Sequence, residues 1–143
     1  AAGPALPGGL GVAATAKGVA EAAKGIATPY GVAIQSQKAA ALTARTEVEG
    51  GATLYRIGTT GKSQAAEAQF WSLQHPLAPG YASRYGLPAE NVLNANFIEA
   101  ATLRPGTSFI TRPAPGIGSN VGGGIEVVVP SGGVQMKWFT GTP

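Results

Sequence analysis

The sequence predicts a small α+β domain rich in short strands, with a helical segment at its N-terminus. Glycine and proline are abundant, at 22 and 11 of 143 residues, without a collagen-like period, and this favours many turns between short elements. From residue 53 onward, runs of β-branched and aromatic residues are bounded by these turn residues, which is typical of strands. The preceding residues are rich in alanine, which favours helix.

The N-terminal third is expected to form a lead segment or linker. Residues 8–27 are rich in alanine and glycine and predict a weak helix, and after a Pro/Gly break residues 32–46 predict a firmer one that ends before Gly50. We place a domain boundary there, between a lead segment of residues 1–50 and a folded domain of residues 51–143. Whether the lead segment packs on that domain stays open at this point.

The second domain is expected to alternate short strands with short helices. Alternating or β-branched runs predict strands at 53–57, 69–73, 96–103, 107–111, 125–129 and 134–139. Helical turns are predicted at 63–70, 81–85 and 88–93, and a long Pro/Gly loop at 113–124.

The composition excludes several kinds of chemistry. The chain has no cysteine, its only histidine is His75, and all 7 acidic residues are glutamates. Disulfides, thiolate metal sites, a zinc cluster and a Ser-His-Asp triad therefore cannot be assembled, and we expect no metal. Acid/base work falls to a glutamate, a tyrosine or His75. The net charge of +3 is a mild basic bias, compatible with a nucleotide or an acidic partner.

Two features of the whole chain bear on its context. No run of about 18 apolar residues is present, so stable membrane insertion is not expected. The chain begins with Ala1 rather than Met, which indicates a piece of a longer protein.

Glu126 is the first candidate for a catalytic residue. It follows three glycines and precedes a Val-Val-Val-Pro run, so it places one carboxylate inside an apolar strand, where a charge needs a partner. The glycines allow a ligand or another backbone to approach closely. The alternative is a solvent-facing glutamate on an edge strand.

Further candidates lie on the other predicted elements. Arg56 is either a phosphate clamp or an edge residue whose stem lies on the surface. Trp71 and Ser72 belong either to the core or to a site. Tyr81 and Tyr85 are one helical turn apart and form either core or a wall on which a flat ring stacks.

The remaining polar candidates lie in predicted loops or on an exposed strand face. His75 precedes a proline in a loop and is a candidate base. Arg112 is either a solvated charge or, from the long loop, a contact for a bound anion. Glu99 is expected to face solvent from its alternating strand.

The order of these motifs resembles the ADP-ribosyltransferase family of the arginine, serine, glutamate type. Arg56 lies on the first strand, Ser72 follows Phe-Trp on the second, a tyrosine-containing helix comes next, and Glu126 lies on a late strand. The resemblance covers roughly residues 53–139 and implies small, strongly bent, mostly antiparallel sheets flanked by short helices. Gly124 stands where many members have a second Glu or Gln, which leaves the acceptor open.

The resemblance implies that NAD is the substrate. Breaking the nicotinamide bond develops positive charge on the ribose, which a carboxylate in a low-dielectric pocket stabilises. The implied roles are phosphate or ribose contact for Arg56, shaping of the nicotinamide pocket for Ser72 beside Trp71, ring stacking for Tyr81 or Tyr85, and catalysis for Glu126.

The chain also resembles the C-terminal toxin domains of bacterial polymorphic toxins, of the contact-dependent inhibition or Rhs type. This implies a domain that is delivered from a secreted or cell-surface parent and acts in the cytoplasm of a target bacterium. Its partners would be a cognate immunity protein and a target-cell protein or RNA that accepts ADP-ribose.

Three alternatives remain open from the sequence. The first is an NAD glycohydrolase that uses water as the acceptor. The second is a small toxin ribonuclease in which Glu126, His75 and an arginine handle a 2′-hydroxyl and a phosphate. The third is a non-enzymatic binding module of a secreted protein.

Overall fold

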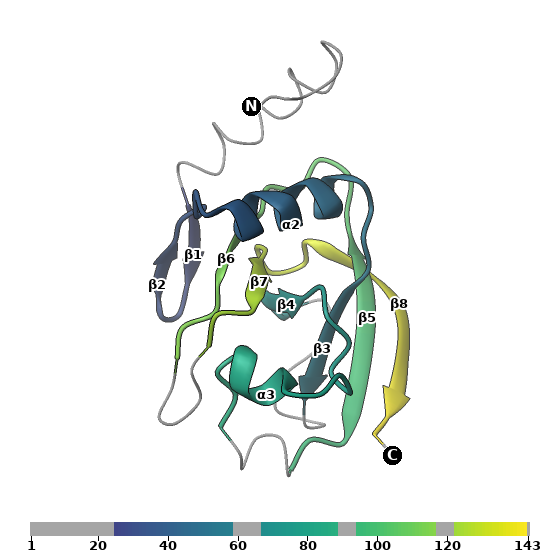
Figure 1. Ribbon diagram of the computed structural model, residues 1–143. Helices are drawn as coiled ribbons and strands as arrows, with labels where there is room; N and C mark the ends of the chain where they lie inside the picture. Colours follow the sequence, from purple (N-terminus) through teal and green to yellow (C-terminus); the bar gives the residue numbers. More distant parts are fainter. Residues whose placement is uncertain (1–24, 59–66, 89–93, 117–121, 143) are drawn as a thin grey trace.

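The computed structural model describes residues 25–58, 67–88, 94–116 and 122–142 (Figure 1). The elements follow one another along the chain as β1 (Ile26–Thr28), β2 (Gly31–Ala33), α2 (Ala39–Glu49), β3 (Leu54–Gly58), β4 (Phe70–Ser72), α3 (Tyr81–Arg84), β5 (Phe97–Leu103), β6 (Ile110–Pro113), β7 (Ile125–Val128) and β8 (Val134–Gly141).

The strands form one six-stranded sheet and one separate hairpin. The sheet order is β6-β7-β4-β3-β5-β8, and every neighbouring pair is antiparallel; β1 and β2 pair only with each other. Figure 1 shows β5 and β8 on one side of the molecule and β6 with the hairpin on the other. The predicted α+β class, with mostly antiparallel sheets and few short helices, is confirmed.

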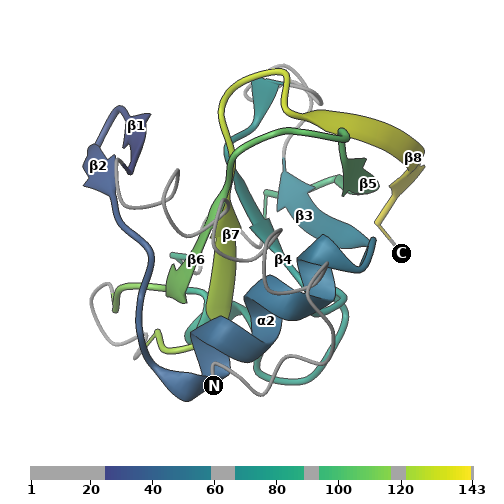
Figure 2. The same cartoon turned by 90° about the horizontal axis from the view of Figure 1, so that it is seen from above.

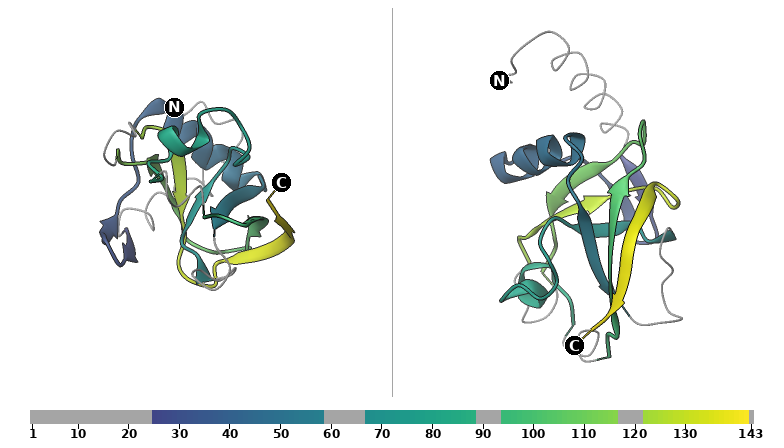
Figure 3. Two further views of the ribbon diagram at one scale, coloured as in Figure 1. Left: turned by 90° about the horizontal axis from the view of Figure 1, so that it is seen from below. Right: turned by 90° about the vertical axis from the view of Figure 1, so that its right-hand side faces the viewer.

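Each face of the sheet is covered over part of its area, and each face has its own cover. On the face that we call the helix face, Leu54, Trp71 and Val127 pack in one cluster with Val48 of α2. Figure 2 shows α2 crossing this part of the molecule, where it contacts β6 and β7. Figure 3 shows that α2 and α3 are separated along the sheet.

The opposite face, which we call the hairpin face, is covered beside β6 and β7 by the β1–β2 hairpin. Ile26 and Ala33 of the hairpin pack against Ile110 and Val128, with Phe70 beside them. Residues of the lead segment therefore contribute to both faces of the sheet. The predicted boundary near Gly50 falls between two elements, α2 and β3, that share one core.

The segment between the hairpin and α2 is held by a buried glutamine. The Gln35 side chain accepts a hydrogen bond from the Thr111 backbone N–H at 2.9 Å and donates to the Thr111 carbonyl at 3.0 Å. Arg45 donates to the same Gln35 amide oxygen at 2.9 Å and lies over the Phe109 ring. This network ties residues 34–45 to the edge of the sheet.

The structure corrects the limits of two predicted elements. The helix predicted at 32–46 begins only at Ala39, because residues 31–33 pair with β1 and Gln35 bonds the sheet edge. The strand predicted at 107–111 lies at Ile110–Pro113, so Arg112 belongs to a strand rather than to the loop. The helices predicted at 63–70 and 88–93 and the weak helix at 8–27 fall largely outside the described residues.

Two kinds of structural feature are absent from the described ranges. No helix there is long and apolar enough to cross a membrane. The same part of the chain contains no group of three or more His, Cys, Asp or Glu side chains that could hold a metal ion.

Candidate active site

One row of residues crosses the hairpin face and takes one residue from each strand of the sheet. The antiparallel registers place these residues side by side, in the order Arg112, Glu126, Ser72, Tyr55, Ala100 and Trp138. Residues directly opposite one another on neighbouring strands have side chains on the same face. Glu126 and Ser72, predicted from different motifs, are therefore cross-strand neighbours, and Arg112 flanks the carboxylate on its other side.

The Glu126 carboxylate is nearly buried and has a charged partner. The residue is 8% exposed, and Arg112 Nε donates to its Oε2 at 2.7 Å. Burial raises the pKa of the Glu126 carboxyl above its ordinary value of 4.5, while the hydrogen bond and the charge of Arg112 oppose that shift. Such a group suits both a general base and a stabiliser of positive charge.

Ser72 is held in place by a tyrosine from α3. Its hydroxyl lies 2.7 Å from the Tyr81 hydroxyl and 2.7 Å from the Gln74 carbonyl oxygen. The Tyr55 carbonyl oxygen lies 3.2 Å from the same hydroxyl, and a carbonyl only accepts, so the single Ser72 proton is directed to these carbonyls and Tyr81 donates to Ser72. Burial raises the pKa of Tyr81 to about 12, against a lowering by the Ser72 hydrogen bond, so the phenol stays protonated.

The glycines before Glu126 let α3 come close. The Tyr85 ring packs against Tyr81 in a tilted arrangement, with centroids 4.7 Å apart. A Cβ on Gly124 would lie 3.0 Å from the Tyr85 ring, and Gly124 N–H donates to the Arg84 carbonyl at 2.9 Å. The tyrosine pair is thereby seated beside the start of β7, next to the catalytic candidate. Tyr81 is 7% exposed, whereas Tyr85 is half-buried and offers more of its ring to a ligand.

Arg56 lies on the helix face, which differs from its expected place beside Glu126. Strand alternation turns it away from its neighbour Tyr55, which belongs to the row on the hairpin face. Arg56 forms an ion pair with Glu99, directly opposite on β5, and its guanidinium lies 5.4 Å from the centre of the Phe97 ring. The positive charge of Arg56 also lowers the pKa of Tyr81, though less than burial raises it.

Two other expectations are corrected by the core. Glu99 was expected to face solvent, but it is 1% exposed and paired with Arg56. Trp71 was a candidate for substrate contact, but it is 2% exposed, packs in the cluster under α2 and donates from Nε1 to the Ala68 carbonyl at 3.0 Å. Its ring fills the core on the face opposite Glu126.

His75 lies close to the row, with two aromatic residues that the sequence did not single out. Its ring centre is 5.2 Å from that of Tyr55 and 6.4 Å from that of Trp138. Its Nδ1 accepts a hydrogen bond from the Leu77 backbone N–H at 3.1 Å. Tyr55 and Trp138 lie in predicted strands, and their side chains point to the same face as that of Ser72. This shared face could be found from the sequence only if the strand register were known.

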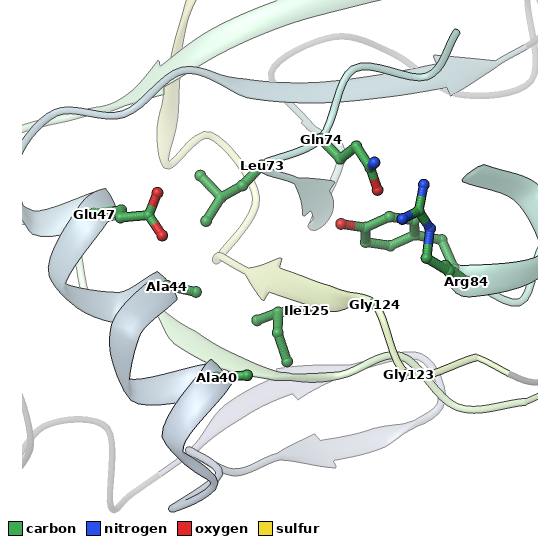
Figure 4. A pocket seen from close by; sticks show the side chains of 10 residues that line it. Ala40, Ala44, Glu47, Leu73, Gln74, Arg84, Gly123, Gly124 and Ile125 are labelled. Atoms are coloured by element: carbon green, nitrogen blue, oxygen red, sulfur yellow. The ribbon is translucent and has the colours of Figure 1, made fainter. Parts of the chain in front are cut away.

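A cleft lies on the helix face, beyond the ends of β4 and β7 (Figure 4). Its volume is about 490 Å³, and its walls include Glu47 of α2, Gln74, Arg84 and Tyr85. Tyr85 connects the cleft to the candidate site through its ring contact with Tyr81. Glu126 and Arg112 do not line the cleft, so it is a neighbour of the row and not part of it.

No family model, curated protein or solved structure matches this chain. The geometry of the row itself is therefore the basis on which a function can be proposed. A nearly buried carboxylate beside an arginine and opposite a tyrosine-bound serine contains the groups that acid/base or electrostatic chemistry requires.

Proposed function

We propose that the protein is an enzyme that cleaves the bond between nicotinamide and ribose in NAD and transfers ADP-ribose to a macromolecule of a target cell. The observation that carries this proposal is the pairing of Glu126 with Ser72 across β7 and β4. This pairing supports the resemblance to the ADP-ribosyltransferase family, because two residues of the family's motifs, 54 positions apart, meet on the hairpin face and the Glu126 carboxylate is nearly buried.

The chemistry suits a single carboxylate. Nicotinamide leaves with the electron pair of the bond, and the ribose carbon acquires positive charge that Glu126 stabilises. The acceptor then forms the new bond at that carbon, and its proton passes to the Glu126 carboxylate. Burial strengthens both effects because the dielectric constant around the carboxylate is lower than in water.

The neighbouring side chains take supporting roles in this proposal. Arg112 holds the Glu126 carboxylate in one orientation and limits the rise of its pKa. Ser72 and Tyr81 shape the nicotinamide pocket, and the more exposed ring of Tyr85 stacks on nicotinamide. The phosphate contact implied for Arg56 has no support from its place on the helix face, where its ion pair with Glu99 joins β3 to β5.

The test begins with the purified protein and NAD alone. Release of nicotinamide without any acceptor, abolished by Glu126→Gln, identifies an NAD glycohydrolase that uses water. Release that requires a bacterial lysate, together with ADP-ribose attached to protein or RNA, identifies a transferase. Absence of both reactions in the folded protein contradicts the proposal.

A ribonuclease is the second candidate, because His75, Arg112 and Glu126 lie on or beside the same row. A base, an acid and a cation on one face of a sheet are the groups that a 2′-hydroxyl attack on phosphate needs. Cleavage of tRNA or rRNA without NAD, lost in His75→Ala, would favour this reading. An NAD-cleaving enzyme should keep its kcat for cleavage of the nicotinamide bond when the imidazole is removed.

The biological setting follows from the second resemblance. We propose a toxin domain delivered from a secreted or cell-surface parent into the cytoplasm of a target bacterium, with a cognate immunity protein as its partner. Expression in a bacterial cytoplasm should arrest growth, and Glu126→Gln should relieve the arrest. Equal growth of cells expressing the two proteins at equal levels would favour a non-enzymatic binding module.

A further inference from the structure

We propose that Tyr55, His75 and Trp138 form the platform that binds the adenine ring of the dinucleotide. This inference rests on the proposed function and adds to it the residues that hold the non-reacting end of the substrate. The three rings come from β3, from the loop after β4 and from β8, yet their centres lie 5.2 to 6.4 Å apart. Trp138 is 40% exposed, and the other two rings are half-buried.

The platform lies on the same face as the candidate catalytic carboxylate. Tyr55 is two strands and Trp138 four strands from Glu126 along the row. Neighbouring strands are about 4.8 Å apart, so these steps correspond to about 10 Å and about 19 Å. NAD has two riboses and a pyrophosphate between its rings, so adenine must bind well away from the reacting carbon, across β4 and β3.

The chemistry of the rings suits a purine. Aromatic side chains bind bases by stacking, and the exposed Trp138 ring offers the largest surface for it. Ala100 lies between Tyr55 and Trp138 in the row and is fully buried, so its methyl group forms a floor beneath the larger rings. His75 accepts at Nδ1 from Leu77, so the neutral imidazole carries its proton on Nε2, as a donor for a purine nitrogen.

The chain provides a matched control at the next residue. Phe139 is 60% exposed on the same edge strand, but strand alternation places it on the helix face, where it stacks on Phe97 with centroids 4.9 Å apart. Trp138→Ala and Phe139→Ala each remove one exposed ring from β8. Only the first removes a ring from the face that carries Glu126.

The experiment compares cleavage of NAD with cleavage of nicotinamide mononucleotide, which lacks the adenosine. We expect Trp138→Ala to raise the KM for NAD roughly tenfold or more, as base stacking implies, with little change in kcat. Its cleavage of nicotinamide mononucleotide should equal that of the wild type. Phe139→Ala should leave both reactions unchanged, and thermal melting should show all three proteins folded.

Calorimetric titration with AMP separates the two proposals. If the wild type cleaves NAD, and Trp138→Ala has the same KM and AMP affinity as Phe139→Ala, the adenine platform is refuted and the proposed function stands. If the wild type cleaves no NAD but binds AMP, and only Trp138→Ala loses this affinity, the proposed function is refuted and the three rings remain an adenine-nucleotide site. If the wild type neither cleaves NAD nor binds AMP, both proposals are refuted.

Discussion

Replacing Glu126 with glutamine is the sharpest test of the site, because it removes one charge and keeps the shape of the side chain. The glutamine oxygen can still accept the hydrogen bond that Arg112 donates at 2.7 Å, so the local packing should survive. What disappears is the negative charge that the proposed mechanism places next to the reacting ribose. The protein should fold as the wild type does and lose most of the proposed NAD-cleaving activity.

The size of the loss follows from the surroundings of the carboxylate. A unit charge about 4 Å from a developing cation, at an effective dielectric constant of about 20, contributes about 4 kcal/mol, or roughly 10³-fold in rate. Arg112 offsets part of this, since its guanidinium already neutralises some of the carboxylate charge. We therefore expect kcat to fall between about 10² and about 10³-fold.

The assay is the rate of nicotinamide release from NAD by the purified proteins. Glu47→Gln serves as the control, because that exposed carboxylate lies on α2, across the sheet, and its loss changes the net charge equally. Circular dichroism and thermal melting verify that each variant is folded. A Glu126→Gln protein that releases nicotinamide at the wild-type rate would refute the assignment of the carboxylate.

Three further predictions concern stability and titration. Burial raises the pKa of Glu126 in the folded protein, so this carboxyl contributes stability below its ordinary pKa of 4.5 and loses that contribution as the pH rises through its pKa in the folded protein. Urea unfolding between about pH 4 and about pH 8 should therefore show the wild type losing stability relative to Glu126→Gln. Tyr81→Phe should cost about 1 kcal/mol in urea unfolding, through the lost hydrogen bond to Ser72, and should remove the phenol that titrates near pH 12 in near-ultraviolet absorbance. Gly124→Ala should lower the free energy of unfolding by about 1–3 kcal/mol, because its Cβ would lie 3.0 Å from the Tyr85 ring; an unchanged melting temperature would contradict this packing.

The sequence predicted the sheet well where strands are bounded by turn residues. The strands at β3, β4, β5, β7 and β8 were expected close to their observed limits, because Gly and Pro bracket β-branched or aromatic runs there. The hairpin was missed because its strands have only 3 residues each, and Val32 and Ala33 also begin an alanine-rich helical pattern. Such short strands exist only because Ile26 and Ala33 bury against the sheet.

The candidate site was predicted only in part, because register is a tertiary property. Glu126, Ser72 and the tyrosine pair could be chosen from local sequence, but which residue lies opposite which depends on how β4, β3 and β7 align. Tyr55 and Arg56 are adjacent in the sequence, and that single step decides which face each side chain occupies. The burial of Glu99 was missed for the same reason, since its partner lies 43 positions earlier.

The glutamine that bridges to Thr111 has a consequence for self-association. An unpaired edge strand can recruit strands from other chains and start aggregation. At β6 this template is interrupted, because the Gln35 amide and the Ser36 N–H already occupy the Thr111 backbone groups. Recruitment of a foreign strand is thereby directed toward β8, the other end of the sheet.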